Sequence, residues 1–222
     1  CDPDDVNLAL RRNRMEYFYT DVQFRGEYPQ YALNYFEENN IHIDITEEDK
    51  AILKSNTMDY LAISYYYSQM VDSKRNDMNP ASVTPNPNLK ANPWGWAVDP
   101  KGLYNSLSQY WDRYGKAIII AENGFGMYDQ LDNGEVHDDY RIDYLSSHIE
   151  QIKMAMYDGV EVIAYCAWGP IDIISCSSAQ MEKRYGFIYV DLDNEGKGSG
   201  KRIKKDSFYW YKGVIESNGE NL

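Results

Sequence analysis

Glu122 is the residue of this sequence best placed to do chemistry. It follows the apolar run Ala117-Ile118-Ile119-Ile120-Ala121 and precedes Asn123-Gly124. The run is typical of a strand covered on both faces, and Asn-Gly, whose residues both tolerate a positive φ, is predicted to end that strand. Parallel β/α folds present catalytic groups at the carboxyl ends of strands, so Glu122 is a candidate catalytic carboxylate. For the tetrapeptide taken alone, a solvated turn after a strand remains the alternative.

Two further predicted strands end in aromatic residues. One ends at Ser64-Tyr65-Tyr66 and the other at Trp168-Gly169-Pro170, and both ends are expected at the same edge of the sheet as Glu122. An indole face can stack on the apolar face of a sugar ring, and a phenol hydroxyl can hold a carboxylate in one rotamer. The residues at this edge therefore predict a sugar-binding site. The alternative is that Trp168 is an ordinary core residue at a strand end.

The loop after the third strand carries hydroxyls and cations. Ser175-Cys176-Ser177-Ser178 is followed by Lys183-Arg184-Tyr185 in a chain that is acidic as a whole. A phosphate group needs several short hydrogen bonds and a fixed positive charge, so this loop favours a pocket for an anion. A solvated loop with incidental charges is the alternative.

Helical and strand patterns alternate along the chain. A helix is predicted from Asp4 or Asp5 to about Arg14, with residues 15–22 as a continuation. The other expected elements are helices at 30–39, 46–55, 101–114, 139–158 and 207–217, strands at 60–66, 116–121 and 160–168, half a hairpin at 185–190, and long loops at 72–93, 127–138 and 169–184. In the helix expected at 139–158, Ile142, Leu145, Ile149 and Ile152 lie on one apolar stripe. The alternation of helices and strands predicts an α/β fold with three parallel strands joined by right-handed crossovers.

Composition narrows the class of protein. The 222 residues are 43% hydrophobic, which is enough for a core, and the net charge of −13 argues against a nucleic-acid partner. The three cysteines, Cys1, Cys166 and Cys176, form no metal-type cluster, and Cys166 is expected to be a small buried residue. Free thiols and the lack of a long apolar stretch or signal peptide predict a cytoplasmic protein with no membrane partner.

Several motifs together resemble glycoside hydrolase family 1, and in particular its bacterial 6-phospho-β-glucosidases. Ala121-Glu122-Asn123-Gly124 is similar to the nucleophile motif of that family. The other similar stretches are Trp94-Gly95-Trp96, Val136 to Ile142, Trp168 to Asp191, and Ser207 to Lys212. The resemblance covers essentially the whole chain and implies part of a (β/α)8 barrel over residues 1–222.

The resemblance also implies a role for each site residue. Glu122 is similar to the nucleophile that forms a covalent glycosyl-enzyme intermediate, and Tyr66 to the residue that orients it. Trp168 resembles the floor under the sugar ring and Trp96 the platform for the leaving group. A 6-phosphate would be held by Ser177, Lys183 and Tyr185, with Ser175 as a further contact. No cofactor or metal is implied.

One family motif is absent from the chain. The acid–base glutamate of the family lies in an Asn-Glu-Pro motif, which this sequence does not contain. A retaining glycosidase needs two carboxyl groups about 5 Å apart. The chain is therefore expected to be the C-terminal portion of such an enzyme, inactive alone, with the missing N-terminal part or a second copy of itself as its partner.

The predicted function is hydrolysis of small phosphorylated β-glucosides. Family members that take neutral sugars typically have a glutamate at the position of Ser175, and a serine there removes a charge that would repel phosphate. Two alternatives stay open: a non-catalytic phospho-sugar-binding fragment, and a β-glucosidase for neutral sugars.

Overall fold

The computed structural model describes residues 2–222, so Cys1 lies outside the described residues. The chain forms two compact units. The first comprises the residues up to Leu61, Gln69–Pro87 and Arg113–Lys116, and the second comprises Ala62–Ser68, Asn88–Asp112 and Ala117–Leu222. All candidate site residues belong to the second unit.

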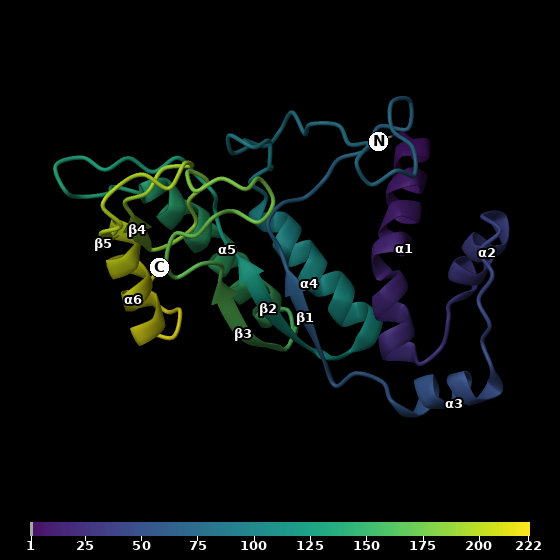
Figure 1. Ribbon diagram of the computed structural model, residues 1–222. Coiled ribbons are helices and arrows are strands. Elements are labelled where there is room, and N and C mark those ends of the chain that lie inside the picture. The colour runs from purple at the N-terminus through teal and green to yellow at the C-terminus, as the bar shows by residue number, and fades with distance from the viewer. Residues whose placement is uncertain (1) are drawn as a thin grey trace. The chain divides into compact units, whose positions relative to one another are not determined.

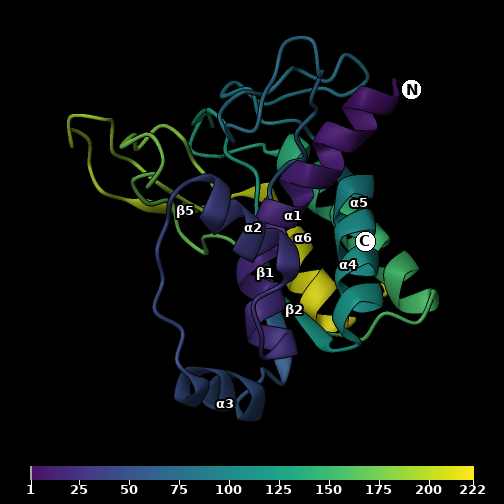
Figure 2. The ribbon, with the colours of Figure 1, turned by 90° about the vertical axis from the view of Figure 1, so that its right-hand side faces the viewer.

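The first unit contains three helices, coloured purple to blue in Figures 1 and 2: α1 (Pro3–Arg25), α2 (Gln30–Glu38) and α3 (Glu47–Ser55). The two segments expected before residue 22 form the single helix α1. The expected cap at Asp4 or Asp5 is wrong, because Asp2 Oδ1 accepts the Asp4 N–H at 3.1 Å and Pro3 occupies the first helical turn.

The three predicted parallel strands are present. They are β1 (Tyr60–Ser64), whose last three residues lie in the second unit, β2 (Ala117–Asn123) and β3 (Val162–Ala167), in the order β1-β2-β3. β2 and β3 pair in parallel, with Ile118 opposite Val162 and Ile120 opposite Tyr165. The arrowheads of all three strands point the same way in Figure 1. Their carboxyl ends therefore share one edge, which is what the site requires.

Helices follow the first two strands. α4 (Pro100–Tyr114) contributes the fully buried Leu103 and Leu107, and α5 (Asp139–Tyr157) contributes the buried stripe expected from its sequence, including Leu145, Ile149 and Ile152. In Figure 2 both helices run along the same flank of the strands. These apolar helix faces pack on the sheet and thereby fix the position of the carboxyl ends of the strands.

The predicted hairpin is confirmed. β4 (Ile188–Val190) pairs antiparallel with β5 (Arg202–Lys204), and helix α6 (Asp206–Glu216) follows directly. The long segment 72–93 contains no regular helix or strand, as its asparagine and proline content predicts.

The expectation that Cys166 is buried is wrong. Cys166 is exposed, and its strand neighbour Ile163 is 54% exposed. β3 lies at the edge of the three-stranded sheet, so part of its surface has no cover within the described residues.

None of the helices within residues 2–222 has the length and apolar character needed to cross a membrane.

Candidate active site

Glu122 lies at the carboxyl end of β2, where the sequence predicts it. The strand is longer than expected and includes Glu122 and Asn123. The Tyr66 hydroxyl donates to Glu122 Oε2 at 3.0 Å, and the Tyr65 N–H donates to the Glu122 carbonyl at 2.9 Å. Burial raises the pKa of Tyr66, and the hydrogen bond to Glu122 raises it further. Tyr66 therefore stays protonated and serves as a fixed donor to one carboxylate oxygen.

Asn123 braces the ends of the strands from a fully buried position. Its Nδ2 donates to the Tyr65 carbonyl at 2.7 Å and to the Tyr144 hydroxyl at 3.1 Å, and its Oδ1 accepts from Tyr165 at 2.9 Å. Tyr144 in turn donates to the Tyr66 carbonyl at 2.8 Å. These bonds fix the backbone on both sides of the Glu122–Tyr66 pair.

The expected reason for the Asn-Gly pair is wrong. Neither Asn123 nor Gly124 has a positive φ. Gly124 is required by close packing instead, because a Cβ there would lie 3.1 Å from the Trp168 Cβ and 3.2 Å from the Trp168 carbonyl oxygen. The Trp168 N–H also donates to the Asn123 carbonyl at 2.7 Å. The half-buried Trp168 is thereby held beside the nucleophile candidate.

Lys183 is a buried cation. It is 1% exposed, and its Nζ donates to Ser177 Oγ at 3.1 Å. Ser177 Oγ lies 3.2 Å from Ser175 Oγ. Burial lowers the pKa of Lys183, and within residues 2–222 this ammonium group forms no ion pair with a carboxylate. A buried ammonium whose charge is not neutralised is suited to binding an anion.

Aromatic rings surround the Lys183 ammonium. Its Nζ lies 3.8 Å from the ring centroid of Trp96, 5.0 Å from that of Trp94 and 5.8 Å from that of Tyr185. Gly126 permits this packing, because a Cβ there would lie 2.9 Å from Tyr185 Cζ and 3.1 Å from Lys183 Cε. Burial raises the pKa of Tyr185 to about 12.

The nucleophile candidate and the anion loop share one aromatic cluster. The Tyr66 ring lies edge-on to Trp96 at 5.5 Å and to Tyr185 at 6.3 Å between centroids. Tyr66 is bonded to Glu122, and Trp96 and Tyr185 pack around Lys183. The structure thus connects every residue selected from the sequence through contacts within the second unit. They are Tyr66, Trp96, Glu122, Trp168, Ser175, Ser177, Lys183 and Tyr185.

A buried ion network supports the backbone of the Lys183–Tyr185 segment. Arg184 donates to Asp172 Oδ2 at 3.2 Å, and Arg141 donates to the Arg184 carbonyl at 3.0 Å and to Asp129 Oδ1 at 2.9 Å. Lys205 bridges Asp129 and Asp172. Burial raises the pKa of Asp129, but the charges of Arg141 and Lys205 outweigh this effect and hold that pKa below its usual value. Asp129 is therefore ionised, and its ion pairs with Arg141 and Lys205 help to fix the loop.

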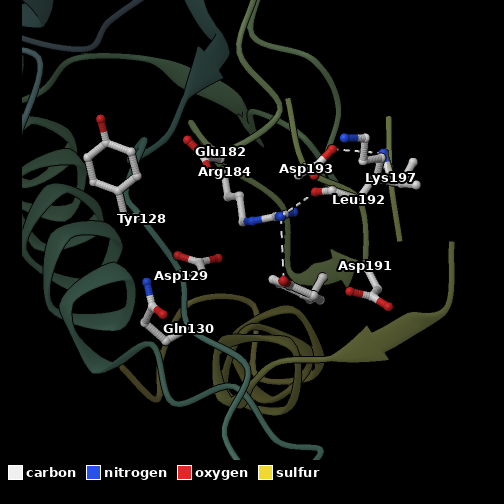
Figure 3. A pocket seen from close by; sticks show the side chains of 10 residues that line it. Tyr128, Asp129, Gln130, Glu182, Arg184, Asp191, Leu192, Asp193 and Lys197 are labelled. Atoms are coloured by element: carbon white, nitrogen blue, oxygen red, sulfur yellow. Dashed lines mark hydrogen bonds between the residues drawn. The ribbon is translucent and has the colours of Figure 1, made fainter. Parts of the chain in front are cut away.

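A pocket of about 240 Å³ lies at the edge of this network. Figure 3 shows Arg184 in it, with a hydrogen bond to the Leu192 carbonyl at 2.7 Å, beside the acidic side chains of Asp191 and Asp193. Glu122 and Lys183 do not line it. Of the two cations that line this pocket, Arg184 is paired with Asp172 and Lys197 is exposed, so neither is a buried, unpaired charge like that of Lys183.

Several supporting residues were not predicted from the sequence. Tyr144 and Tyr165 bind Asn123, and Gln180 accepts a hydrogen bond from Trp94. Tyr144 lies next to the apolar stripe of α5. A tyrosine among the aliphatic residues of that helix is the one sequence feature that could have indicated its role. No sequence pattern points to Gln180, because its contact joins two loops 86 residues apart.

Comparisons with known proteins agree with this geometry. The sequence matches the profile of glycosyl hydrolase family 1 over residues 2–220. It is 48% identical to a phospho-cellobiase of Klebsiella oxytoca over 100% of this chain and 49% of the relative, and 47% identical to a 6-phospho-β-glucosidase of Dickeya chrysanthemi over 99% of this chain and 48% of the relative. The chain spans about half the length of these curated relatives.

A solved structure supports the same conclusion for the fold. The family 1 β-glucosidase of Thermotoga maritima superposes with a TM-score of 0.83 at 29% identity, over 98% of this chain and 47% of that one. The parallel strands and their helices are thus part of a (β/α)8 barrel. With a catalytic carboxylate candidate at a barrel strand end and a profile match over nearly its whole length, the chain belongs to glycosyl hydrolase family 1.

Proposed function

We propose that this chain is the nucleophile-bearing part of a retaining glycoside hydrolase that acts on 6-phospho-β-D-glucosides. Lys183 carries this proposal, because it is a buried ammonium group within the described residues that has hydroxyl and aromatic neighbours and no carboxylate partner. It is linked to Glu122 through the rings of Trp96, Tyr185 and Tyr66. A site with a nucleophile at one side and a buried cation at the other suits a sugar whose anionic group is remote from its reacting carbon.

Glu122 would act as the nucleophile. Its carboxylate would attack the anomeric carbon while the bond from that carbon to the leaving oxygen breaks, giving a covalent glycosyl-enzyme intermediate. A second carboxyl group, supplied by the rest of the barrel, would protonate the leaving oxygen. The same group would then take a proton from water, whose oxygen attacks the anomeric carbon and releases Glu122. The Tyr66 hydroxyl, bonded to Oε2, leaves Oε1 as the attacking atom.

The 6-phosphate would lie among Ser175, Ser177, Lys183 and Tyr185. Charge-assisted hydrogen bonds from an ammonium group to a phosphate are about twice as strong as neutral ones. Ser177 would contribute a hydroxyl that already contacts the ammonium at 3.1 Å. Trp168 would support the sugar ring and Trp96 the leaving group. No cofactor or metal takes part in this scheme.

The names of the relatives support the same substrate class. The relatives cited above are a phospho-cellobiase and a 6-phospho-β-glucosidase, and an aryl-phospho-β-D-glucosidase of Bacillus subtilis is 49% identical over 100% of this chain. We propose that residues 1–222 form one part of a single barrel. Its assignment to the C-terminal portion of such a barrel stays a prediction.

The test uses the complete protein, meaning a polypeptide that carries the whole barrel. The substrates are 4-nitrophenyl 6-phospho-β-D-glucoside and its unphosphorylated counterpart. Glu122→Gln should lower kcat on the phosphorylated substrate at least about a thousandfold, since removal of a catalytic nucleophile costs this much or more. Lys183→Met should lower kcat/KM about 10- to 100-fold on the phosphorylated substrate and leave the plain one unchanged.

Two outcomes would favour the alternatives. A complete protein that prefers the plain substrate would be a β-glucosidase for neutral sugars. A protein that binds glucose 6-phosphate by calorimetry, loses binding in Lys183→Met and turns over neither substrate would be a phospho-sugar-binding protein. The isolated 222-residue chain is expected to give no turnover, and a measurable rate from it would contradict the need for a second part.

We also propose a cytoplasmic location. Phosphorylated β-glucosides arise when sugars are phosphorylated during uptake, so the enzyme that cleaves them would act inside the cell. The exposed, unpaired Cys166 and Cys176 fit a reducing compartment. Fractionation of producing cells, with activity assayed in the soluble cytoplasmic and the extracellular fractions, tests the location directly.

A further inference from the structure

Gln180 connects two loops that carry different parts of the site. Its Oε1 accepts the Trp94 indole N–H at 3.0 Å. Its main-chain carbonyl accepts the Ser175 N–H at 2.9 Å. One residue thereby joins the serine loop, residues 175–180, to the tryptophan pair, Trp94 and Trp96.

The tryptophan pair is built as one unit. Asn92 is 7% exposed, and its Oδ1 accepts the N–H groups of both Trp94 and Trp96 at 3.0 Å. The Trp94 ring also packs against Tyr128, with the centroids 4.6 Å apart. A shift of Trp94 would therefore be transmitted to Trp96 through Asn92.

Both rings of the pair face the Lys183 ammonium, at 5.0 and 3.8 Å. Within the described residues, Ser177 provides the one side-chain hydrogen bond of this ammonium. The position of the cation therefore depends on the serine loop and on the tryptophan pair, the two pieces that Gln180 joins.

We propose that Gln180 is a positioning residue that couples the serine loop to the tryptophan pair and thereby sets the preference for phosphorylated over plain substrates. The inference rests on the proposed function and extends it, because it assigns specificity to a residue that does not itself contact the reacting atoms. When the Gln180–Trp94 bond is present, the hydroxyls of the serine loop and the Lys183 ammonium are held in one arrangement. Without it, the serine loop and the tryptophan pair move independently, and the phosphate meets a cation that is less well placed.

The test is a double-mutant cycle in the complete protein. Gln180→Met removes the acceptor at similar size, and Trp94→Phe removes the N–H donor while keeping an aromatic ring against Tyr128. Each single variant should lower kcat/KM on 4-nitrophenyl 6-phospho-β-D-glucoside about fivefold, as expected for one hydrogen bond, mainly through KM. The double variant should be no worse than the worse single one, because both changes remove the same bond. On the unphosphorylated substrate, Gln180→Met should leave kcat/KM unchanged.

Controls separate this role from simple support of the fold. Gln151→Met, on α5, is the matched glutamine change away from the site and should leave kcat/KM unchanged on both substrates. Additive effects in the cycle, or equal losses on both substrates, would overturn the coupling while leaving the proposed function intact. A parent enzyme without any preference for the phosphorylated substrate would overturn both.

Discussion

At the scale of single residues, the Tyr66–Glu122 bond connects the geometry to the proposed chemistry. The phenol donates to Oε2 at 3.0 Å, and its own backbone is fixed by Tyr144. In the proposed attack on the sugar, this donor would keep the other carboxylate oxygen in line with the anomeric carbon. The two side chains come from adjacent strand ends, so the pair exists only when β1 and β2 are correctly aligned.

Tyr66→Phe should reduce the kcat of the complete protein about 10- to 100-fold, since hydrogen bonds to charged groups contribute roughly 1.5–3 kcal/mol. The matched control is Tyr67→Phe, which removes a neighbouring hydroxyl without a bond to Glu122 and should lose far less. Steady-state rates on the phosphorylated nitrophenyl substrate measure both. Equal effects of the two changes would argue against an orienting role.

Ala179 has a backbone conformation that is unfavourable for alanine. Its φ is 53°, in the left-handed region, within the turn closed by the Ala179 N–H to the Ser175 carbonyl at 2.8 Å. Ala179→Gly should raise the free energy of unfolding by about 1 kcal/mol, because glycine adopts this conformation without a steric penalty. Thermal denaturation of the complete protein would show this as a higher Tm.

Ala91→Gly is the control for that change. Ala91 is exposed and does not have a positive φ, so glycine there should have no stabilising effect. A Tm that rises equally in both variants, or falls in Ala179→Gly, would show that the turn does not strain the chain.

At the scale of elements, the sequence predicted what depends on local pattern. The three parallel strands, the hairpin and the stripe on α5 follow from apolar periodicity, and Glu122 follows from its place after such a run. It could not predict that Gly124 is needed for the approach of Trp168, or that Gln180 meets Trp94. These contacts join segments that are distant in the sequence, so they produce no periodic pattern from which they could be predicted.

A buried histidine couples α5 to pH. His148 is fully buried, stacks on Tyr144 at 3.9 Å, and donates from Nδ1 to the Tyr144 carbonyl at 2.6 Å. Its Nε2 has no hydrogen-bond partner among residues 2–222. Burial lowers its pKa to about 4, against small opposing effects from this hydrogen bond and from Asp99. The folded state therefore contains the neutral ring, and the unfolded state takes up a proton first as the pH falls.

Stability should consequently fall as the pH drops from about 6.5 to about 4, by about 3 kcal/mol in total from this residue. Above pH 6.5 the contribution of His148 should not vary with pH. His148→Leu should remove this part of the pH dependence, as measured by Tm between pH 4 and 8. Identical slopes for the parent and variant proteins would show that another group is responsible.

At the scale of the molecule, the second unit has apolar side chains that no other part of the described chain covers. β3 exposes Ile163 and Cys166 at the edge of the described sheet. An open hollow of about 620 Å³ is lined mainly by apolar residues, among them Ala167, Phe187, Phe208 and Tyr211. Exposed strand edges and apolar patches of this kind favour association with other chains. In a closed barrel, further strands would cover such an edge.

The isolated 222-residue chain should therefore melt without a sharp cooperative transition and should associate in solution. Size-exclusion chromatography with light scattering is expected to show species larger than 25.8 kDa, and a dye that fluoresces on apolar surfaces should bind strongly. The complete protein is the control and should melt cooperatively with little dye binding. The opposite result would be a monomeric isolated chain with one sharp transition and weak dye binding. It would show that this part of the barrel is stable with β3 and the hollow beside α6 exposed to water, and that the second part is needed only for catalysis.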